Sequence, residues 1–180
     1  MKKYKLDKET LVLILLLMMF IGGVFGYIYE VIFYKIDTGK FINRGTTIGP
    51  WIPIYAFGSL LIYLTTYKVK DKWPLVLLIS AISCGLLEYI TGYLLFNISG
   101  TRLWNYNTEI LNYGNIEGFV CARSVIFFGL SGCFLVYGIV PLLKKFATKI
   151  SKQELKILSL SLFSLFFIDF LYSSILSKIF

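Results

Sequence analysis

The sequence predicts an all-α membrane protein, a polytopic bundle of five membrane-spanning helices. Hydrophobic residues make up 57% of the chain and charged residues only 16%, whereas soluble domains need more polar surface. Long apolar runs recur along the chain, each near the length of about 20 residues that crosses a bilayer. The loops between them are too short for a separate domain. We therefore expect residues 1–180 to form a single membrane domain.

Five runs are long enough to cross about 30 Å of hydrocarbon at about 1.5 Å per residue. They lie near residues 11–33, 49–67, 74–96, 118–143 and 155–176. The first follows a lysine-rich start, as a secretory signal peptide does, but its apolar core is too long and no A-x-A cleavage site ends it. We predict that it is retained as a helix.

The second run opens with Gly49, Pro50 and Pro53. Proline is tolerated in the first turn of a helix, so these residues predict a helix start. Three residues precede it closely: Asn43, Arg44 and Gly45. The free amides and positive dipole of the helix start, beside a cationic side chain, predict a mouth that attracts anions. A tight loop before a closely packed helix is an equal alternative.

Small residues and an aromatic loop accompany the next runs. Gly49 and Gly58 bracket Tyr55 and permit close approach of a neighbouring helix. The loop at 97–117 is rich in Asn, Gly, Trp and Tyr, which suits aromatic rings at headgroup depth. Cys84, Cys121 and Cys133 lie in apolar stretches without a CxxC pattern and are interpreted as packing residues.

Four ionisable residues interrupt the apolar runs: Glu30, Glu88, Arg123 and Asp169. A lone ion in a bilayer costs at least about 2.5 kcal/mol, so these groups need partners. Counting along the helices places the first three at similar depth in the outer half of the bilayer, with Asp169 slightly deeper. We interpret them as a polar pocket for a solute, lipid headgroup or proton. Internal ion pairs that hold the helices together, or an interface with another subunit, are the alternatives.

The remaining charges predict the topology. Twelve Lys and Arg residues lie on the side of the amino terminus and five on the other side. The positive-inside rule then places the amino terminus in the cytoplasm and the carboxyl terminus outside the cell membrane. The net charge of +8 is thus explained without nucleic acid, since the basic residues lie between apolar runs and not on one basic helix face.

A parallel repeat is a further hypothesis. Glu30 precedes Arg44 by 14 residues and Glu88 precedes Arg102 by 14. A glycine lies a few residues before each glutamate, Gly26 before Glu30 and Gly85 before Glu88. The helix after each loop opens with a glycine, Gly49 or Gly118. The first two helices would then repeat as the third and fourth, and parallel repeats with a site at their interface are a known plan of transporters.

Several chemistries are absent from the sequence. There is no histidine, so the usual general base, nucleophile pairs and commonest metal ligand are missing. No G-x-x-x-x-G-K-[ST] motif occurs, so ATP hydrolysis by a P-loop would need a separate ATPase subunit. We expect no metal, no cofactor and, on balance, no enzyme activity.

Spaced motifs resemble the ABC-transporter type IV permease family. They are GYIYEVIF (26–33), NRGTTIGPWIPIYAFG (43–58), GLLEYITGYLLF (85–96), WNYN (104–107) and NIEGFVCARSVIFFG (115–129). The similarity covers roughly residues 20–143 and implies a multi-pass bacterial permease. Its motif positions include Tyr55, Trp104, Tyr106 and Ser124.

Two sets of candidate residues result. The predicted substrate-binding set is Glu30, Arg44, Tyr55, Glu88, Trp104 and Arg123, and the predicted structural set is Asn43, Gly45, Gly49, Pro50, Pro53, Gly58 and Gly118. We expect a permease-like protein in the lipid bilayer that moves a solute or lipid through a polar outer-leaflet pocket, with an ATPase in trans and a homo-oligomer both compatible. A membrane enzyme or accessory factor acting on envelope lipids, or a scaffolding subunit, is the alternative.

Overall fold

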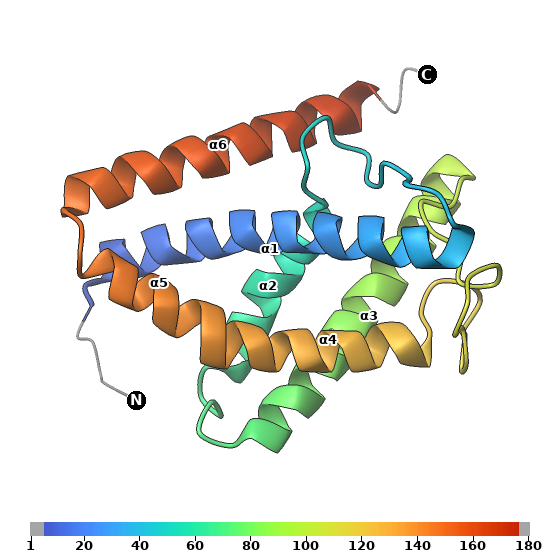
Figure 1. Ribbon diagram of the computed structural model, residues 1–180, viewed down its shortest axis with the longest axis horizontal. Coiled ribbons are helices and arrows are strands. Elements are labelled where there is room, and N and C mark those ends of the chain that lie inside the picture. Colours follow the sequence, from blue (N-terminus) through green and yellow to red (C-terminus); the bar gives the residue numbers. More distant parts are fainter. Residues whose placement is uncertain (1–5, 177–180) are drawn as a thin grey trace.

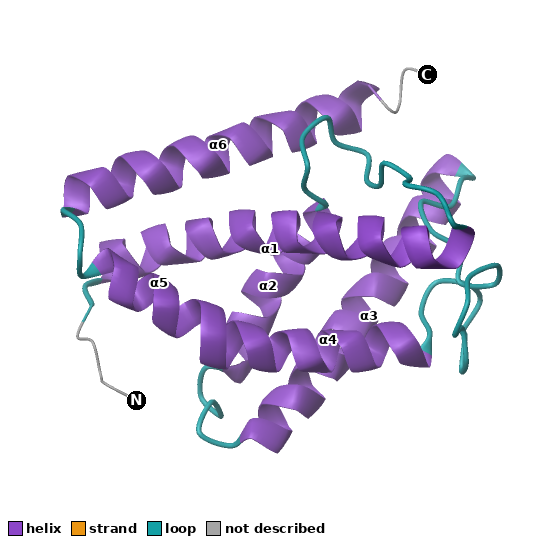
Figure 2. Ribbon diagram, viewed as in Figure 1, coloured by secondary structure: helices purple, strands orange, loops and turns teal. Residues whose placement is uncertain are grey.

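A computed structural model describes residues 6–176, which form a helical bundle without strands (Figure 2), as the sequence predicts. The helices are α1 (Lys8–Thr38), α2 (Pro53–Thr66), α3 (Trp73–Ser99), α4 (Ala122–Phe134), α5 (Val140–Ala147) and α6 (Lys152–Leu176). A π-helical turn, η1 (Leu135–Ile139), joins α4 to α5. Lys2, Lys3, Lys5 and Lys178, which enter the charge count, lie outside the described residues.

Four segments are long and apolar enough to cross a membrane: α1, α3, the joined α4–α5 and α6. The fifth apolar helix, α2, has 14 residues, which at about 1.5 Å per residue is shorter than a hydrocarbon core of about 30 Å. The prediction that it begins at Gly49 is wrong, because only Pro53 lies in its first turn. The residue before a proline avoids the helical region, so Ile52 is extended and the helix starts after it.

The chain before α2 is irregular, and several of its donors bond groups on α1 and α6. The Ile52 amide donates to the Gly23 carbonyl of α1 at 3.0 Å. The Ile48 and Gly49 amides donate to the carboxylate of Asp169 on α6, at 3.1 and 2.8 Å, and the Trp51 indole donates to it at 2.9 Å. Irregular backbone at membrane depth is tolerated only when protein buries it in this way.

Asp169 therefore accounts for part of the predicted anion-attracting mouth. The amides lie where the mouth was predicted, but they are not free, because they donate to a carboxylate from α6 of the same chain. Gly49 is required at this point, because a Cβ on it would overlap the Trp51 ring. Gly45 has a φ of +95°, a conformation that favours glycine.

Asp169→Asn is expected to lower the free energy of unfolding by about 1–3 kcal/mol, because an amide NH2 would face donors that now bond a charged acceptor. The measurement is thermal unfolding of the purified protein in detergent. Ser161→Ala is the control, since this α6 hydroxyl is exposed and bonds only the carbonyl of Ile157 in its own helix. Equal melting temperatures for both variants would contradict the anchoring role.

The helices pack in chain order, and α6 returns alongside α1 (Figure 1). Small residues allow close contact: a Cβ on Gly22 of α1 would approach Ser59 of α2, and one on Gly132 of α4 would overlap Ser80 of α3. Such small-residue contacts are typical of membrane helix pairs. The described start of α1 and the end of α6 lie at opposite ends of the bundle.

Charged side chains join the starts of α1 and α6. Lys152 lies 2.8 Å from Asp7 and 2.6 Å from Glu9. Asp7 also caps α1 by accepting from the Thr10 amide at 2.7 Å. The hydrogen bond from Lys152 holds the pKa of the Asp7 carboxyl well below its usual range. These pairs join the starts of the two helices, and α6 runs parallel to α1 (Figure 1).

Candidate functional site

A polar pocket lies where α1 and α3 end and α4 begins, under the loop that joins α3 to α4. Its volume is about 30 Å³, which is room for one or two water molecules. It is lined by Tyr29, Glu30, Phe33, Tyr34, Arg44, Ile54, Tyr55, Glu88, Trp104, Tyr106, Glu109, Arg123, Ser124, Phe127 and Phe128.

All six residues of the predicted substrate-binding set line this pocket. They come from four helices and two loops: Glu30, Arg44, Tyr55, Glu88, Trp104 and Arg123. The depth argument from the sequence thus places Glu30, Glu88 and Arg123 at one level, as observed, whereas Asp169 lies apart on α6. That these residues bind a substrate stays a prediction.

Glu30 and Arg44 form the first ion pair. The Nε of Arg44 lies 3.1 Å from Glu30 Oε2, and the Tyr55 hydroxyl donates to Glu30 Oε1 at 3.2 Å. The Arg44 guanidinium also lies over the Tyr34 ring, 4.1 Å from its centre. Gly26, one turn before Glu30 on the same face, makes room for Tyr55, because a Cβ there would overlap the ring.

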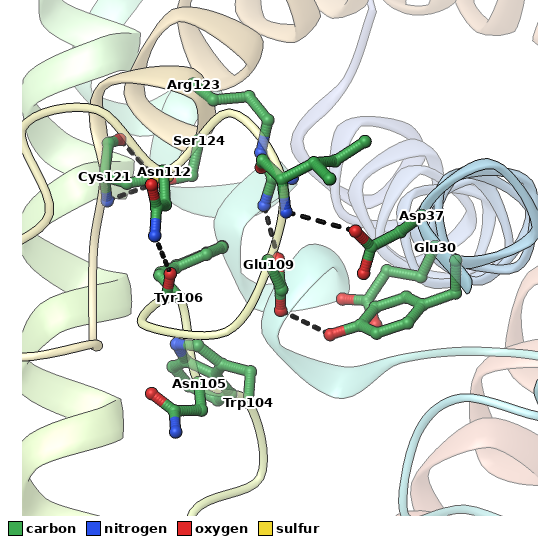
Figure 3. A network of polar contacts seen from close by, with 12 residues as sticks. Glu30, Asp37, Trp104, Asn105, Tyr106, Glu109, Asn112, Cys121, Arg123 and Ser124 are labelled. Carbon is green, nitrogen blue, oxygen red and sulfur yellow. Dashed lines mark hydrogen bonds and ion pairs between the residues drawn. The ribbon is translucent and has the colours of Figure 1, made fainter.

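Arg123 and Glu109 form the second ion pair (Figure 3). Nη2 of Arg123 lies 2.5 Å from Glu109 Oε2, and the Glu109 side chain is only 5% exposed. Nη1 donates to the Ile110 carbonyl at 3.0 Å, and the guanidinium lies 3.8 Å from the centre of the Phe33 ring. The suggested grouping of Arg123 with Glu30, Glu88 and Asp169 is therefore wrong as a pairing.

Glu109 also ties the α3–α4 loop to α1. The Tyr34 hydroxyl donates to its other oxygen, and the next residue, Ile110, donates its amide to Asp37 of α1 at 3.1 Å. In Figure 3 the Glu109 side chain lies between Arg123 of α4 and the α1 residues. Glu109 was not among the residues predicted from the sequence. The one available signal is that it is an acid in an aromatic loop that precedes a helix with an arginine near its start.

Glu88 is buried, 5% exposed, and has no cationic partner among residues 6–176. Its Oε1 accepts from the Tyr106 hydroxyl at 2.5 Å. Within the described chain, Oε2 has no hydrogen-bond partner, and neither has the Nε of Arg123. Burial raises the pKa of Tyr106, so its phenol stays a donor. The pocket thus holds one buried carboxyl group that is half satisfied.

In the repeat hypothesis Arg102 corresponds to Arg44 and Glu88 to Glu30, but the pair that Arg44 forms with Glu30 is not repeated. Instead, Arg102 donates to the Glu117 carbonyl at 2.7 Å and lies over Phe119, 4.2 Å from the ring centre. The two halves therefore differ at the pocket. The loop needs Gly118, whose φ is +78° and whose Cβ would meet Asn105, Asn107 and Arg102.

The other motif residues act by packing and turns. Asn43 accepts from the Tyr27 hydroxyl at 2.9 Å. Gly58 faces α3, where the Cys84 thiol donates to its carbonyl at 3.8 Å. The Trp104 indole donates to the Phe119 carbonyl at 2.9 Å and closes the loop over the pocket. Residues 6–176 contain no group of three His, Cys, Asp or Glu side chains that could hold a metal ion.

The helices and the buried charges define a multi-pass membrane protein with a polar pocket enclosed at one end of its bundle. A family model described as "Putative ABC-transporter type IV" matches residues 17–174, and the chain belongs to this family. The match confirms the resemblance seen in the motifs and extends it through most of α6. No curated protein and no solved structure gives a significant match. The chain is thus related to membrane transporters.

Proposed function

We propose that this protein is a permease-like membrane subunit whose polar pocket binds a small cationic group during transport. The observation that carries the proposal is Glu88, a buried carboxyl that, within residues 6–176, has one oxygen without a hydrogen-bond partner and no ion pair. The two ion pairs neutralise Glu30 and Glu109. Of the three carboxylates in the pocket, only Glu88 is then left to take a proton or a cation.

Electrostatics supports this role. A buried carboxylate without a counter-charge is strongly destabilising in a membrane, so Glu88 is favoured either protonated or neutralised by a bound cation. The cavity is small, so a solute larger than water must displace the loop residues over it, Trp104 and Tyr106. Exchange of a proton for a cationic group at one carboxyl is a simple way to couple binding to this rearrangement.

The energy source is proposed to be a separate ATPase, because the sequence has no P-loop motif. The connection between α2 and α3 carries three lysines, and residues 144–156, from the end of α5 to the start of α6, carry five. In the proposed topology they face the cytoplasm, with the pocket towards the outside. They would form the docking surface for that partner.

Glu88→Gln is expected to reduce transport at least about tenfold, since a hydrogen bond to a charged group contributes about 1.5–3 kcal/mol. The measurement is ATP-dependent uptake of radiolabelled methylamine and decylamine by membrane vesicles from cells that produce the protein. Glu117→Gln is the matched control, because Glu117 is an exposed loop glutamate outside the pocket.

The outcomes separate the competing roles. Uptake that is lost only in Glu88→Gln, with an unchanged melting temperature, supports transport. Uptake equal to that of Glu117→Gln together with a changed melting temperature would assign the charges to scaffolding. A lipid product that depends on Glu88, in place of accumulation, would assign the pocket to a membrane enzyme.

A further inference from the structure

A second cavity lies beside the polar pocket, and its lining is apolar. Its volume is about 70 Å³, and residues of α1, α2, α3, α4 and η1 enclose it. The two cavities share Ile54, Tyr55 and Phe128. The hydroxyl of Tyr55 reaches Glu30 in the polar pocket, while the same side chain forms part of the apolar wall. The two cavities are therefore adjacent, and these three side chains lie between them.

The cavities follow one another along the bundle. On α1 the polar pocket is lined at Glu30 and the apolar cavity at Gly22, eight residues earlier. On the joined α4–α5 the polar pocket is lined at Ser124 and the apolar cavity continues to Ile139. At about 1.5 Å per residue, the combined lining along this segment extends over roughly 22 Å. The pair has a polar end and a long apolar end, as an amphiphile has.

The apolar cavity lies beside the seam between α1 and α4, where Phe25 and Phe134 line it. The closely packed neighbours are α1–α2, α2–α3, α3–α4 and α1–α6. Between α1 and α4 the contact is made by rings: Tyr29 lies 3.7 Å from Phe127 and Phe25 lies 5.8 Å from Phe134, measured between centroids. Phe134 is 54% exposed. Side chains therefore close this seam. Because side chains rotate far more readily than helices separate, the seam can open without moving the helices.

We infer that the protein binds a single-chain amphiphile with a protonated amine head, which enters between α1 and α4. The ammonium group donates to the free oxygen of Glu88, and the alkyl chain passes Tyr55 and Phe128 into the apolar cavity. The cavity of about 70 Å³ is smaller than a long alkyl chain, so the rings of Phe25 and Phe134, which also line it, must turn aside to admit the rest of the chain. Glu88 sets the head group, because its unpartnered oxygen is an acceptor that becomes negatively charged when the carboxyl gives up its proton, and no residue among 6–176 forms an ion pair with it. The inference rests on the proposed function, since it names the class of ligand for the same pocket.

The test is native mass spectrometry of the purified full-length chain in detergent, titrated with decylamine, ethylamine and decanol. Gly58→Leu places a larger side chain in the apolar cavity, where a Cβ has ordinary room, 3.8 Å from the Cys84 sulfur. Ser131→Leu fills the same cavity from α4 and is used in place of Gly58→Leu if that variant does not fold. Gly58→Ala is the matched control. Detergent takes up decylamine equally in all samples, so differences between variants report the protein.

Decylamine is expected to bind the wild type at least about tenfold more tightly than either decanol or ethylamine. Gly58→Leu should weaken decylamine at least about tenfold and change ethylamine less than about twofold. Glu88→Gln should reduce decylamine to the level of decanol. Gly58→Ala should bind as the wild type does.

Three failures are distinguishable. If both amines depend on Glu88 but neither responds to Gly58→Leu or Ser131→Leu, the amphiphile is wrong and the proposed cationic pocket survives. If no amine responds to Glu88→Gln, both proposals are overturned. Binding of decanol as tight as that of decylamine would overturn the amine head group.

Discussion

Arg123→Met is expected to lower the free energy of unfolding by about 3–5 kcal/mol, the usual cost of leaving one member of a buried ion pair without its partner. Glu109 is the residue left behind, with a side chain only 5% exposed. It would keep the Tyr34 hydroxyl as a donor, but no cation. The Ile110 carbonyl would lose its donor as well.

The double variant Arg123→Met/Glu109→Gln separates charge from packing. Glutamine carries no charge and still accepts from Tyr34, so we expect the double variant to recover at least half of the lost stability. The measurement is denaturant unfolding in mixed micelles, followed by tryptophan fluorescence. Lys149→Met is the control for loss of an exposed cation. A double variant less stable than Arg123→Met would refute the explanation by an uncompensated charge.

Gly132→Ala is the second large effect, with an expected loss of about 1–3 kcal/mol from overpacking. The new methyl group would overlap the side chain of Ser80, which is completely buried in the contact between α3 and α4. Neither helix can move aside without disturbing the contact between α3 and α4, the most extensive between any two helices of the described chain. Both helices also carry pocket residues.

Ser80→Gly should restore most of that stability in the double variant, because it removes the atoms that the new methyl group meets. The Ser80 hydroxyl has no hydrogen-bond partner in the described chain, so its loss leaves no donor unsatisfied. Gly138→Ala is the matched control, since a Cβ there lies 3.5 Å from the Phe134 ring, an ordinary contact. Thermal unfolding in one detergent compares all four proteins. An equal loss in Gly132→Ala and Gly138→Ala would contradict this account.

The sequence predicts the helices where hydropathy alone decides them. The last run, expected at 155–176, is the helix Lys152–Leu176. The errors fall where backbone conformation overrides hydropathy. Pro53 starts α2 later than expected, and the turn at Gly118 delays the fourth helix to Ala122, after a single antiparallel bridge between Ile116 and Val120.

The site was predictable in position but not in pairing. Ionisable groups in apolar runs need polar partners, and Glu30, Glu88 and Arg123 line one pocket, whereas Asp169 finds its partners before α2. Counting residues gives depth along a helix but not the direction a side chain faces when the bundle has formed. The partner of Arg123 is Glu109 in a polar loop, where an acid is ordinary and hydropathy gives no signal.

The bond between α6 and the chain before α2 has a consequence for biogenesis. The acceptor of the Ile48 and Gly49 amides, Asp169, is synthesised about 120 residues after them. Until the last helix leaves the translocon, this stretch has no charged acceptor inside the bilayer. The nascent chain can therefore complete this contact only after Asp169 has been made, and a product that stops before Asp169 would leave the two amides without this acceptor.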